Sequence, residues 1–257
     1  MRSWSSVMSA RIGMDGDTGE VYAAGFFRGG WARRMQRMTL AVDLFWSFRS
    51  PYSYLALPRT CALVADFDVD VRLRPVYPLA VRDATFFQRT PPQFARYVKL
   101  DSRRIAEREG ISFGMPRPDP IVQDMQTLAV AREQPRIRRL MHLAAAAQAR
   151  GHSLAFAREV SRLIWGGSTD GWDGGDHLDA AARRAGLSLA ALQRQADADP
   201  QAVEALIEAN QRDHERSGHW GVPTFVFDGE PFFGQDRFEL LVWRLGQHGL
   251  TRRAGTA

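Results

Sequence analysis

The strand-like segments of this chain lie towards its two ends with helical segments between them, and this placement most constrains the fold. An apolar run at 40–46 is typical of a buried strand, and residues 69–76 alternate between apolar and polar side chains. A helix ending near Phe67 is predicted between them, with Ser50 as its N-cap and Pro51 at its first position. A strand, a helix and a second strand in this order imply parallel strands joined by a crossover.

The middle of the chain has a helical pattern, and the strand pattern returns near the C-terminus. Glycine and proline clusters at 114–118 and 166–175 separate the helices. Two strands are then predicted, joined by a turn at Asp228-Gly229 and followed by a closing helix at 236–248. The predicted middle helices span 93–109, 122–132, 136–150, 153–165, 177–185, 188–196 and 200–217, and the two late strands span 224–227 and 230–233.

This order predicts one α/β domain with an insertion. At 257 residues the chain could hold one large domain or two small ones. We expect residues 38–90 and 218–249 to form one domain, with an all-helical insertion at 91–217. Residues 1–37 have no sustained period and are expected to be a disordered extension, or to precede a true start at Met38, with a weak targeting peptide as the other alternative. Residues 250–257 are expected to form a tail.

Charge and cysteine content exclude several classes of protein. The net charge of +5 comes almost wholly from arginine, since Lys99 is the only lysine. The arginines are interspersed with acids, as in 103–109, and do not form the dense patch that a nucleic-acid partner needs. No apolar run is long enough to span a membrane, and a single cysteine, Cys61, excludes an intrachain disulfide and gives no support for secretion. A cytoplasmic protein with neither a nucleic-acid nor a membrane partner is expected. His214 and His219 are five residues apart, which does not favour a metal site.

Two serines at the start of the first helix form the first candidate site. A helix N-terminus stabilises an anion, because its first N–H groups are unpaired and the helix dipole is positive there. This position lowers the pKa of a thiol in redox proteins, which use two cysteines separated by two residues. Ser50 and Ser53 have that spacing, but hydroxyls cannot form a disulfide. A simple N-cap role would also explain Ser50.

Two later segments are candidates for the same site. Pro223 precedes a predicted strand, where a cis peptide bond would turn the N–H and C=O of Val222 outward to pair with an extended peptide. An ordinary trans proline at a strand start is the simpler alternative. Asp236 begins the last helix, where a carboxylate also serves as a favourable charge or cap.

Taken together, these segments resemble a known family. From about residue 40 to 245 the chain resembles the glutathione-dependent 2-hydroxychromene-2-carboxylate isomerases and the similar kappa-class glutathione transferases, which belong to the DsbA-like branch of the thioredoxin superfamily. The matching segments are 48–56, 97–104, 165–166, 221–224 and 233–237. The resemblance implies a thioredoxin-like fold with an inserted all-helical subdomain, and it suggests a homodimer.

The resemblance also implies the site residues, with glutathione as the cofactor. Ser50 would be the catalytic residue beside the glutathione sulfur. Val222, before a cis Pro223, would pair its backbone with the cysteinyl part of glutathione. The γ-glutamyl end would be held by Phe233, Gly234, Gln235 and Asp236, with the Asp236 carboxylate meeting the ammonium group.

The expected activity is isomerisation of an aromatic or unsaturated organic acid, in which a thiolate adds, bonds rotate and the thiol is eliminated. The candidates for binding this small-molecule substrate are Arg82, Gln88, Arg89 and Asp119. The chain departs from the isomerases at Gln235, where they often have asparagine, and it lacks their lysine and Asn-Arg pair after the second strand. The alternatives are a kappa-type transferase or peroxidase, and a non-catalytic thioredoxin-like binding module. A thiol–disulfide oxidoreductase is disfavoured, because neither position 50 nor 53 is a cysteine.

Overall fold

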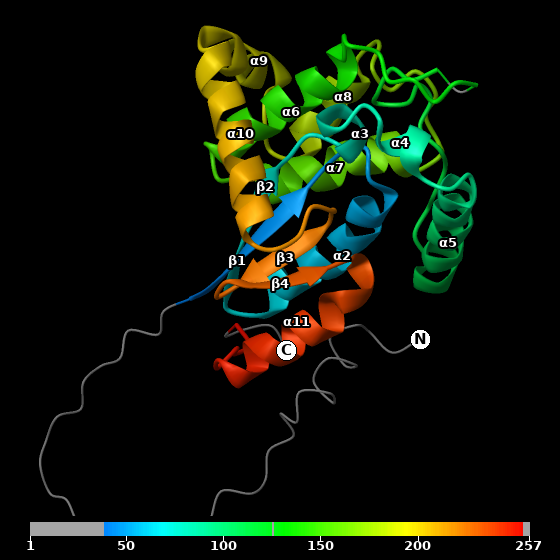
Figure 1. The fold of residues 1–257 in the computed structure, drawn as a ribbon. Helices are drawn as coiled ribbons and strands as arrows, with labels where there is room; N and C mark the ends of the chain where they lie inside the picture. The colour runs from blue at the N-terminus through cyan, green and yellow to red at the C-terminus, as the bar shows by residue number, and fades with distance from the viewer. Residues whose placement is uncertain (1–38, 125, 254–257) are drawn as a thin grey trace, which may run out of the picture.

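A four-stranded sheet lies at the centre of the computed structural model, which describes residues 39–124 and 126–253 (Figure 1). The strand order is β2-β1-β3-β4, with β1 and β2 parallel and the other neighbouring pairs antiparallel. The predicted crossover is confirmed, and its register places Leu40 opposite Val69. The strands are β1 (Leu40–Trp46), β2 (Val69–Pro75), β3 (Thr224–Phe227) and β4 (Glu230–Phe233).

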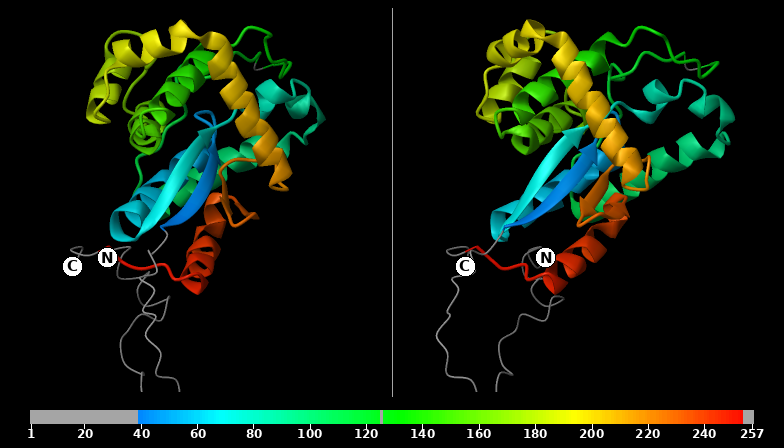
Figure 2. Two further views of the ribbon diagram at one scale, coloured as in Figure 1. Left: turned by 90° about the vertical axis from the view of Figure 1, so that its left-hand side faces the viewer. Right: turned by 60° about the vertical axis from the view of Figure 1, so that its left-hand side comes forward.

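The helices fall into a block inserted between β2 and β3 and two elements packed on the sheet. Helix α2 (Pro51–Asp66) forms the crossover, and α11 (Phe238–Gln247) follows the hairpin after the short η1 (Gln235–Arg237). The views in Figure 2 show α6 to α9 gathered at one end of the sheet, α10 running alongside it and α11 at the other end. The inserted helices are α3 (Leu79–Arg82), α4 (Phe86–Arg89), α5 (Gln93–Glu109), α6 (Pro135–Gln148), α7 (Ser153–Trp165), α8 (His177–Arg184), α9 (Leu189–Ala198) and α10 (Pro200–Arg216).

One predicted helix is wrong. The described residues of the segment 122–132 form an irregular loop, in which Gln123 and Val130 make an isolated antiparallel bridge. The Asp124 side chain accepts hydrogen bonds from the backbone N–H groups of Gln126 and Thr127, at 2.8 and 2.7 Å. Side chains of this kind compete with helical hydrogen bonding, so the apolar spacing of the segment was a misleading signal.

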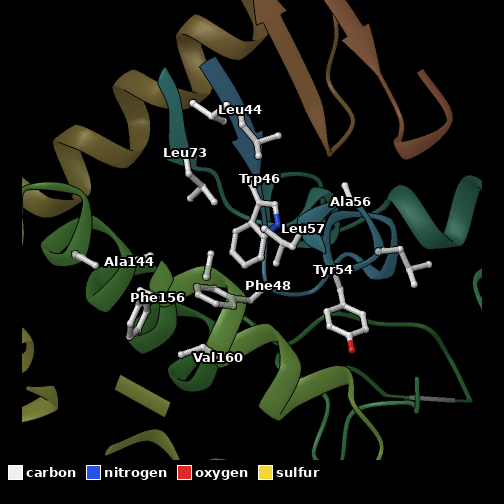
Figure 3. Packing of buried hydrophobic residues seen from close by; sticks show 14 of the residues in the cluster. Leu44, Trp46, Phe48, Tyr54, Ala56, Leu57, Leu73, Ala144, Phe156 and Val160 are labelled. Atoms are coloured by element: carbon white, nitrogen blue, oxygen red, sulfur yellow. The ribbon is translucent and has the colours of Figure 1, made fainter. Parts of the chain in front are cut away.

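The core joins the sheet to the inserted helices just beneath the start of α2. Figure 3 shows Trp46 and Phe48 facing Phe156 and Val160 of α7. The Phe48 ring meets that of Trp46 edge to face at 4.3 Å and that of Phe156 at 6.1 Å, and all three side chains are fully buried. The indole of Trp165 donates to the backbone carbonyl of Phe48 at 2.7 Å. The loop that carries Ser50 is thus fixed from below by α7.

The chain closes against the far end of α2. Leu250 is buried, and Asp68 N donates to Thr251 O at 2.8 Å. Arg253 N donates to Asp66 O at 2.9 Å, so residues 250–253, expected to belong to a tail, are bound to the domain. The predicted extension at 1–37 lies outside the described residues. In the part of the chain that the structure describes, no helix combines the length and apolar character needed to cross a membrane.

Candidate functional site

The start of α2 meets the loop before β3, although the two are far apart in the sequence. Ser50 is the N-cap of α2, and its Oγ accepts a hydrogen bond from Ser53 N at 3.2 Å. The same hydroxyl donates to the backbone carbonyl of Val222 at 3.2 Å. The structure therefore brings together Ser50 and Val222, two residues that the sequence assigned to one site.

The loop before β3 is tied to the end of β4. The Val222–Pro223 peptide bond is cis, as the family resemblance implied. Gly234 N donates to Pro223 O at 2.9 Å, and the buried Thr224 hydroxyl donates to Gly221 O at 2.7 Å. These bonds place the segment that begins at Gly234 beside the Val222 backbone.

The residue before Val222 is glycine for a steric reason. A side chain at Gly221 would collide with the ring of Phe233. That ring stacks on His219 at 3.8 Å, and His219 Nδ1 accepts a hydrogen bond from Gly221 N at 2.9 Å. Burial lowers the pKa of His219, so the imidazole is neutral near pH 7.

The segment predicted to hold the γ-glutamyl end contains one buried and one exposed polar residue. Gly234 has φ of +100°, a conformation that glycine adopts most readily. Gln235 is buried, and its side chain and backbone oxygens both accept from the Arg59 guanidinium of α2. The Asp236 carboxylate is exposed and pairs with Arg237 at 2.9 Å. Gln235 thus anchors the segment, while Asp236 faces solvent.

Tyr52 extends the site towards α5 and was not among the predicted site residues. Its hydroxyl donates to Asp101 Oδ2 at 2.8 Å. Burial and this hydrogen bond raise the pKa of the phenol well above its ordinary value, so the hydroxyl stays protonated. Both residues lie in segments that carry the family resemblance, 48–56 and 97–104. Their presence in these two segments was the signal from which a role for Tyr52 and Asp101 in the site could have been predicted.

Aromatic side chains from four segments lie next to this polar region, and we call them the aromatic rim. The ring of Phe86 contacts those of Phe94 at 5.9 Å and Trp220 at 6.1 Å, and Trp220 lies 6.4 Å from Phe233. Trp220 is 53% exposed, and Phe94 and Phe233 are also exposed. The polar region beside the rim, which we call the polar floor, consists of Ser50, Val222, Thr224 and Gln235.

The predicted substrate-binding residues are not gathered at one point. Arg82 donates to the backbone carbonyls of Tyr77 at 2.9 Å and Trp220 at 2.7 Å, so it supports the rim from behind. Arg89 pairs with Asp83 on an exposed face, and Gln88 is exposed. The fourth candidate, Asp119, pairs with Arg49 at 3.1 Å. Arg49 directly precedes Ser50, and its charge was not predicted to matter.

Other titratable groups lie away from the floor. Cys61 is half-buried within α2, where burial raises the pKa of its thiol. Glu204 of α10 accepts hydrogen bonds from Tyr77, Arg138 and His142, at 3.0, 2.7 and 2.8 Å. This cluster satisfies its own members. Among the described residues, no group of three or more histidine, cysteine or acidic side chains is placed to hold a metal ion.

Comparisons of the sequence and of the structure with known proteins agree on a DsbA-like thioredoxin fold. The family model described as a DSBA-like thioredoxin domain matches residues 41–246. A search of curated proteins finds no significant match. A solved structure of 2-hydroxychromene-2-carboxylate isomerase is similar, with a TM-score of 0.59 and 22% identity over 81% of this chain and 96% of that one.

Two proteins described as an oxidoreductase and a disulfide reductase share the fold as well. A probable DsbA oxidoreductase from Streptomyces coelicolor has a TM-score of 0.56 and 19% identity, over 82% of this chain and 92% of that one. The cytosolic disulfide reductase DsbM from Pseudomonas aeruginosa has a TM-score of 0.53 and 18% identity, over 82% of this chain and 100% of that one. A structure of DsbM with GSH has a TM-score of 0.51 and 19% identity, over 80% of this chain and 99% of that one. At these identities the likeness concerns the fold.

Proposed function

The chain belongs to the DSBA-like thioredoxin domain family, and on that premise we propose that it is a glutathione-dependent enzyme of the isomerase type. Its substrate would be an aromatic or unsaturated compound with an electrophilic carbon. The observation that carries the proposal is the hydrogen bond from Ser50 to Val222 O, which joins the start of α2 to the loop before β3. In this family arrangement a serine stands where a redox enzyme would have a cysteine, so the reactive sulfur must come from a ligand.

The groups around the floor fit the chemistry of glutathione. Glutathione has a thiol, a peptide backbone and an ammonium group, which need a donor beside the sulfur, exposed backbone and a carboxylate. Ser50 offers a hydroxyl at a helix N-terminus, the Val222 segment offers backbone, and Asp236 offers an exposed carboxylate. When bound, glutathione would supply the thiolate nucleophile that adds to the substrate and is later eliminated.

The residues of this chain would keep the sulfur ionised and in place. The first N–H groups of α2 carry partial positive charge and lower the pKa of an acid placed there. Ser50 would turn its hydroxyl from Val222 O to donate to the sulfur. Burial and the hydrogen bond to Asp101 raise the pKa of Tyr52, so its side chain would stay neutral beside the sulfur. Trp220 and Phe233 would offer flat apolar surface to the substrate.

The pKa of the thiol in bound glutathione tests the role of Ser50. We expect that pKa to lie below the ordinary thiol value of about 8.5 and to rise by about one unit in Ser50→Ala, because one charge-assisted hydrogen bond is lost. Ser50→Thr keeps a hydroxyl and should restore most of the effect. Thiolate absorbance during a pH titration gives the measurement, and turnover should fall in parallel. An unchanged pKa in Ser50→Ala would remove Ser50 from the mechanism.

A transferase that couples glutathione to an aromatic electrophile is the second candidate. It is favoured by the pairing of Arg49 with Asp119 and of Arg89 with Asp83, which leaves these cations occupied by internal carboxylates. An isomerase of organic acids would need a cation for the acid group. A binding module without turnover is the remaining alternative, and the same assays would identify it by binding without product.

A further inference from the structure

The arginine next to Ser50 is neutralised by a carboxylate from a distant loop. Arg49 Nε and Nη2 lie 3.3 and 3.1 Å from the two carboxylate oxygens of Asp119. The two residues are 70 positions apart, and their side chains are only 25% and 33% exposed. The guanidinium also lies over the ring of Phe87 at 5.3 Å, and Phe87 contacts Phe86 of the aromatic rim at 5.3 Å. Arg49 therefore stands between the floor and the rim with its charge balanced.

Asp119 is held in position by its own loop. Its Oδ1 accepts a hydrogen bond from Ile121 N at 3.0 Å. The preceding carbonyl, that of Pro118, accepts from the indole of the buried Trp172 at 2.7 Å. The backbone on both sides of Asp119 is thus anchored, so its carboxylate is a fixed partner of Arg49 rather than a side chain that pairs by chance at the surface.

Two other arginines near the rim also have their hydrogen-bond donors occupied, Arg82 by neutral carbonyls and Arg89 by a carboxylate. Arg82 gives its Nε and Nη2 donors to backbone carbonyls, one of which belongs to Trp220. Arg89 pairs with Asp83. His219, stacked on Phe233, is neutral near pH 7 because burial lowers its pKa. These groups shape the rim. Arg82 keeps its positive charge, because backbone carbonyls are neutral, but its Nε and Nη2 donors are occupied and do not face a ligand at the rim.

We propose that Asp119, acting through Arg49, makes this site select uncharged aromatic compounds over those that carry a carboxylate. Asp119 is a positioning and specificity-determining residue in this account, and Arg49 is the group that an acid would have to reach. The inference rests on the proposed function only in placing the substrate at the rim beside Ser50. It narrows the substrate class from aromatic or unsaturated compounds in general to uncharged aromatic compounds.

The physical reason is competition for one guanidinium. An acid that approaches Arg49 must either displace a paired carboxylate from its donors or bind a cation whose charge is already balanced. Like charges brought close together cost free energy, whereas a neutral ring of the same shape meets no such cost. Removal of the Asp119 charge should therefore favour the acid and leave the neutral compound nearly unaffected.

The test is equilibrium binding of a matched pair of probes, 2-naphthamide and 2-naphthoate, measured by calorimetry at about pH 8, where the acid is ionised. We expect the wild type to bind the amide more tightly. In Asp119→Asn the affinity for 2-naphthoate should rise about tenfold, the worth of one charge-assisted hydrogen bond, with little change for the amide. In Arg49→Gln/Asp119→Asn that gain should disappear, since the effect runs through Arg49.

Glu230→Gln is the matched control. Glu230 pairs with Arg244 through two contacts of 2.7 and 3.1 Å at the start of β4, and its loss should leave the affinity ratio of the two probes unchanged. If Asp119→Asn does not fold, Arg49→Gln alone should weaken the acid further relative to the amide. Wild-type binding of the acid as tight as that of the amide, or an unchanged ratio in Asp119→Asn, would overturn the inference. Because glutathione is not needed in this assay, failure of the proposed function would not be mistaken for failure of the inference.

Discussion

The polar floor and the aromatic rim of the site differ in how they are bound to the rest of the molecule. Floor residues such as Thr224 and Gln235 are buried and hydrogen-bonded to backbone or to Arg59. Rim residues such as Trp220 and Phe94 touch one another through their rings and remain open to solvent. The floor is part of the packed fold, whereas the rim is a surface mounted on it.

This difference teaches where stability and specificity reside. A change in the floor disturbs buried polar groups and the core below, so it affects the free energy of unfolding. A change in the rim removes exposed ring surface and should alter which substrate binds. In the proposed function the fold would keep one glutathione-binding floor, while the rim and the Arg49–Asp119 pair would vary with the substrate.

The largest effect is expected when one side chain in the core below the floor and one in the rim are each replaced by alanine and their free energies of unfolding are compared. Phe48→Ala removes a fully buried ring that packs against Trp46 and Phe156, and it should lower the free energy of unfolding by about 3–5 kcal/mol. Trp220→Ala should cost about 0.5 kcal/mol or less, because most surface positions are tolerant. Chemical denaturation of both variants checks this contrast. Similar losses would show that the rim is as much a part of the fold as the floor.

The second prediction concerns acid sensitivity beneath the floor. His214 of α10 is fully buried and stacks on Phe45 at 4.7 Å, and burial, followed by the nearby charge of Arg82, lowers its pKa to about 4. The folded protein therefore favours the neutral imidazole. Its contribution to stability is complete above the unfolded pKa of about 6.5 and is lost as the pH falls towards 4, by roughly 3 kcal/mol.

The variant His214→Phe separates this effect from the rest of the acid response. It keeps a ring against Phe45 and has no group to protonate, so the fall in the free energy of unfolding between pH 6.5 and 4 should be smaller by about the same amount. His177→Phe, at an exposed position, is the control and should leave the slope unchanged. Equal slopes in wild type and His214→Phe would show that protonation of His214 does not cause the loss of stability in acid.

The fold was largely predictable from the sequence, because its signals are local. Ser50 and Pro51 marked the start of α2, and the alternation at 69–76 marked β2. The helix predicted at 122–132 was wrong because hydrogen bonds to the Asp124 side chain, and not the apolar spacing, determine the backbone conformation there. The short helices α3 and α4 were not predicted, since one turn carries almost no periodicity.

The site was predictable only in part, and the reason is distance along the chain. Ser50 and Val222 could be assigned to one site through family resemblance, and the structure places them in contact. Arg49 and Asp119 carry no local signal of their pairing, because the bond joins a strand end to a loop far along the chain. Arg82 was expected to bind substrate but donates to backbone carbonyls, a role that depends on how two loops meet.

The central claim is that the floor and the neighbouring Asp236 bind glutathione, and calorimetry on wild type and Asp236→Ala tests it most directly. The Asp236 carboxylate is exposed and lies outside the core, so its removal should not disturb folding. We predict that the wild type binds glutathione and that Asp236→Ala binds about tenfold or more weakly, since it lacks the partner for the ammonium group. A wild-type protein that does not bind glutathione would contradict the account, leaving a thioredoxin-like fold without the proposed cofactor.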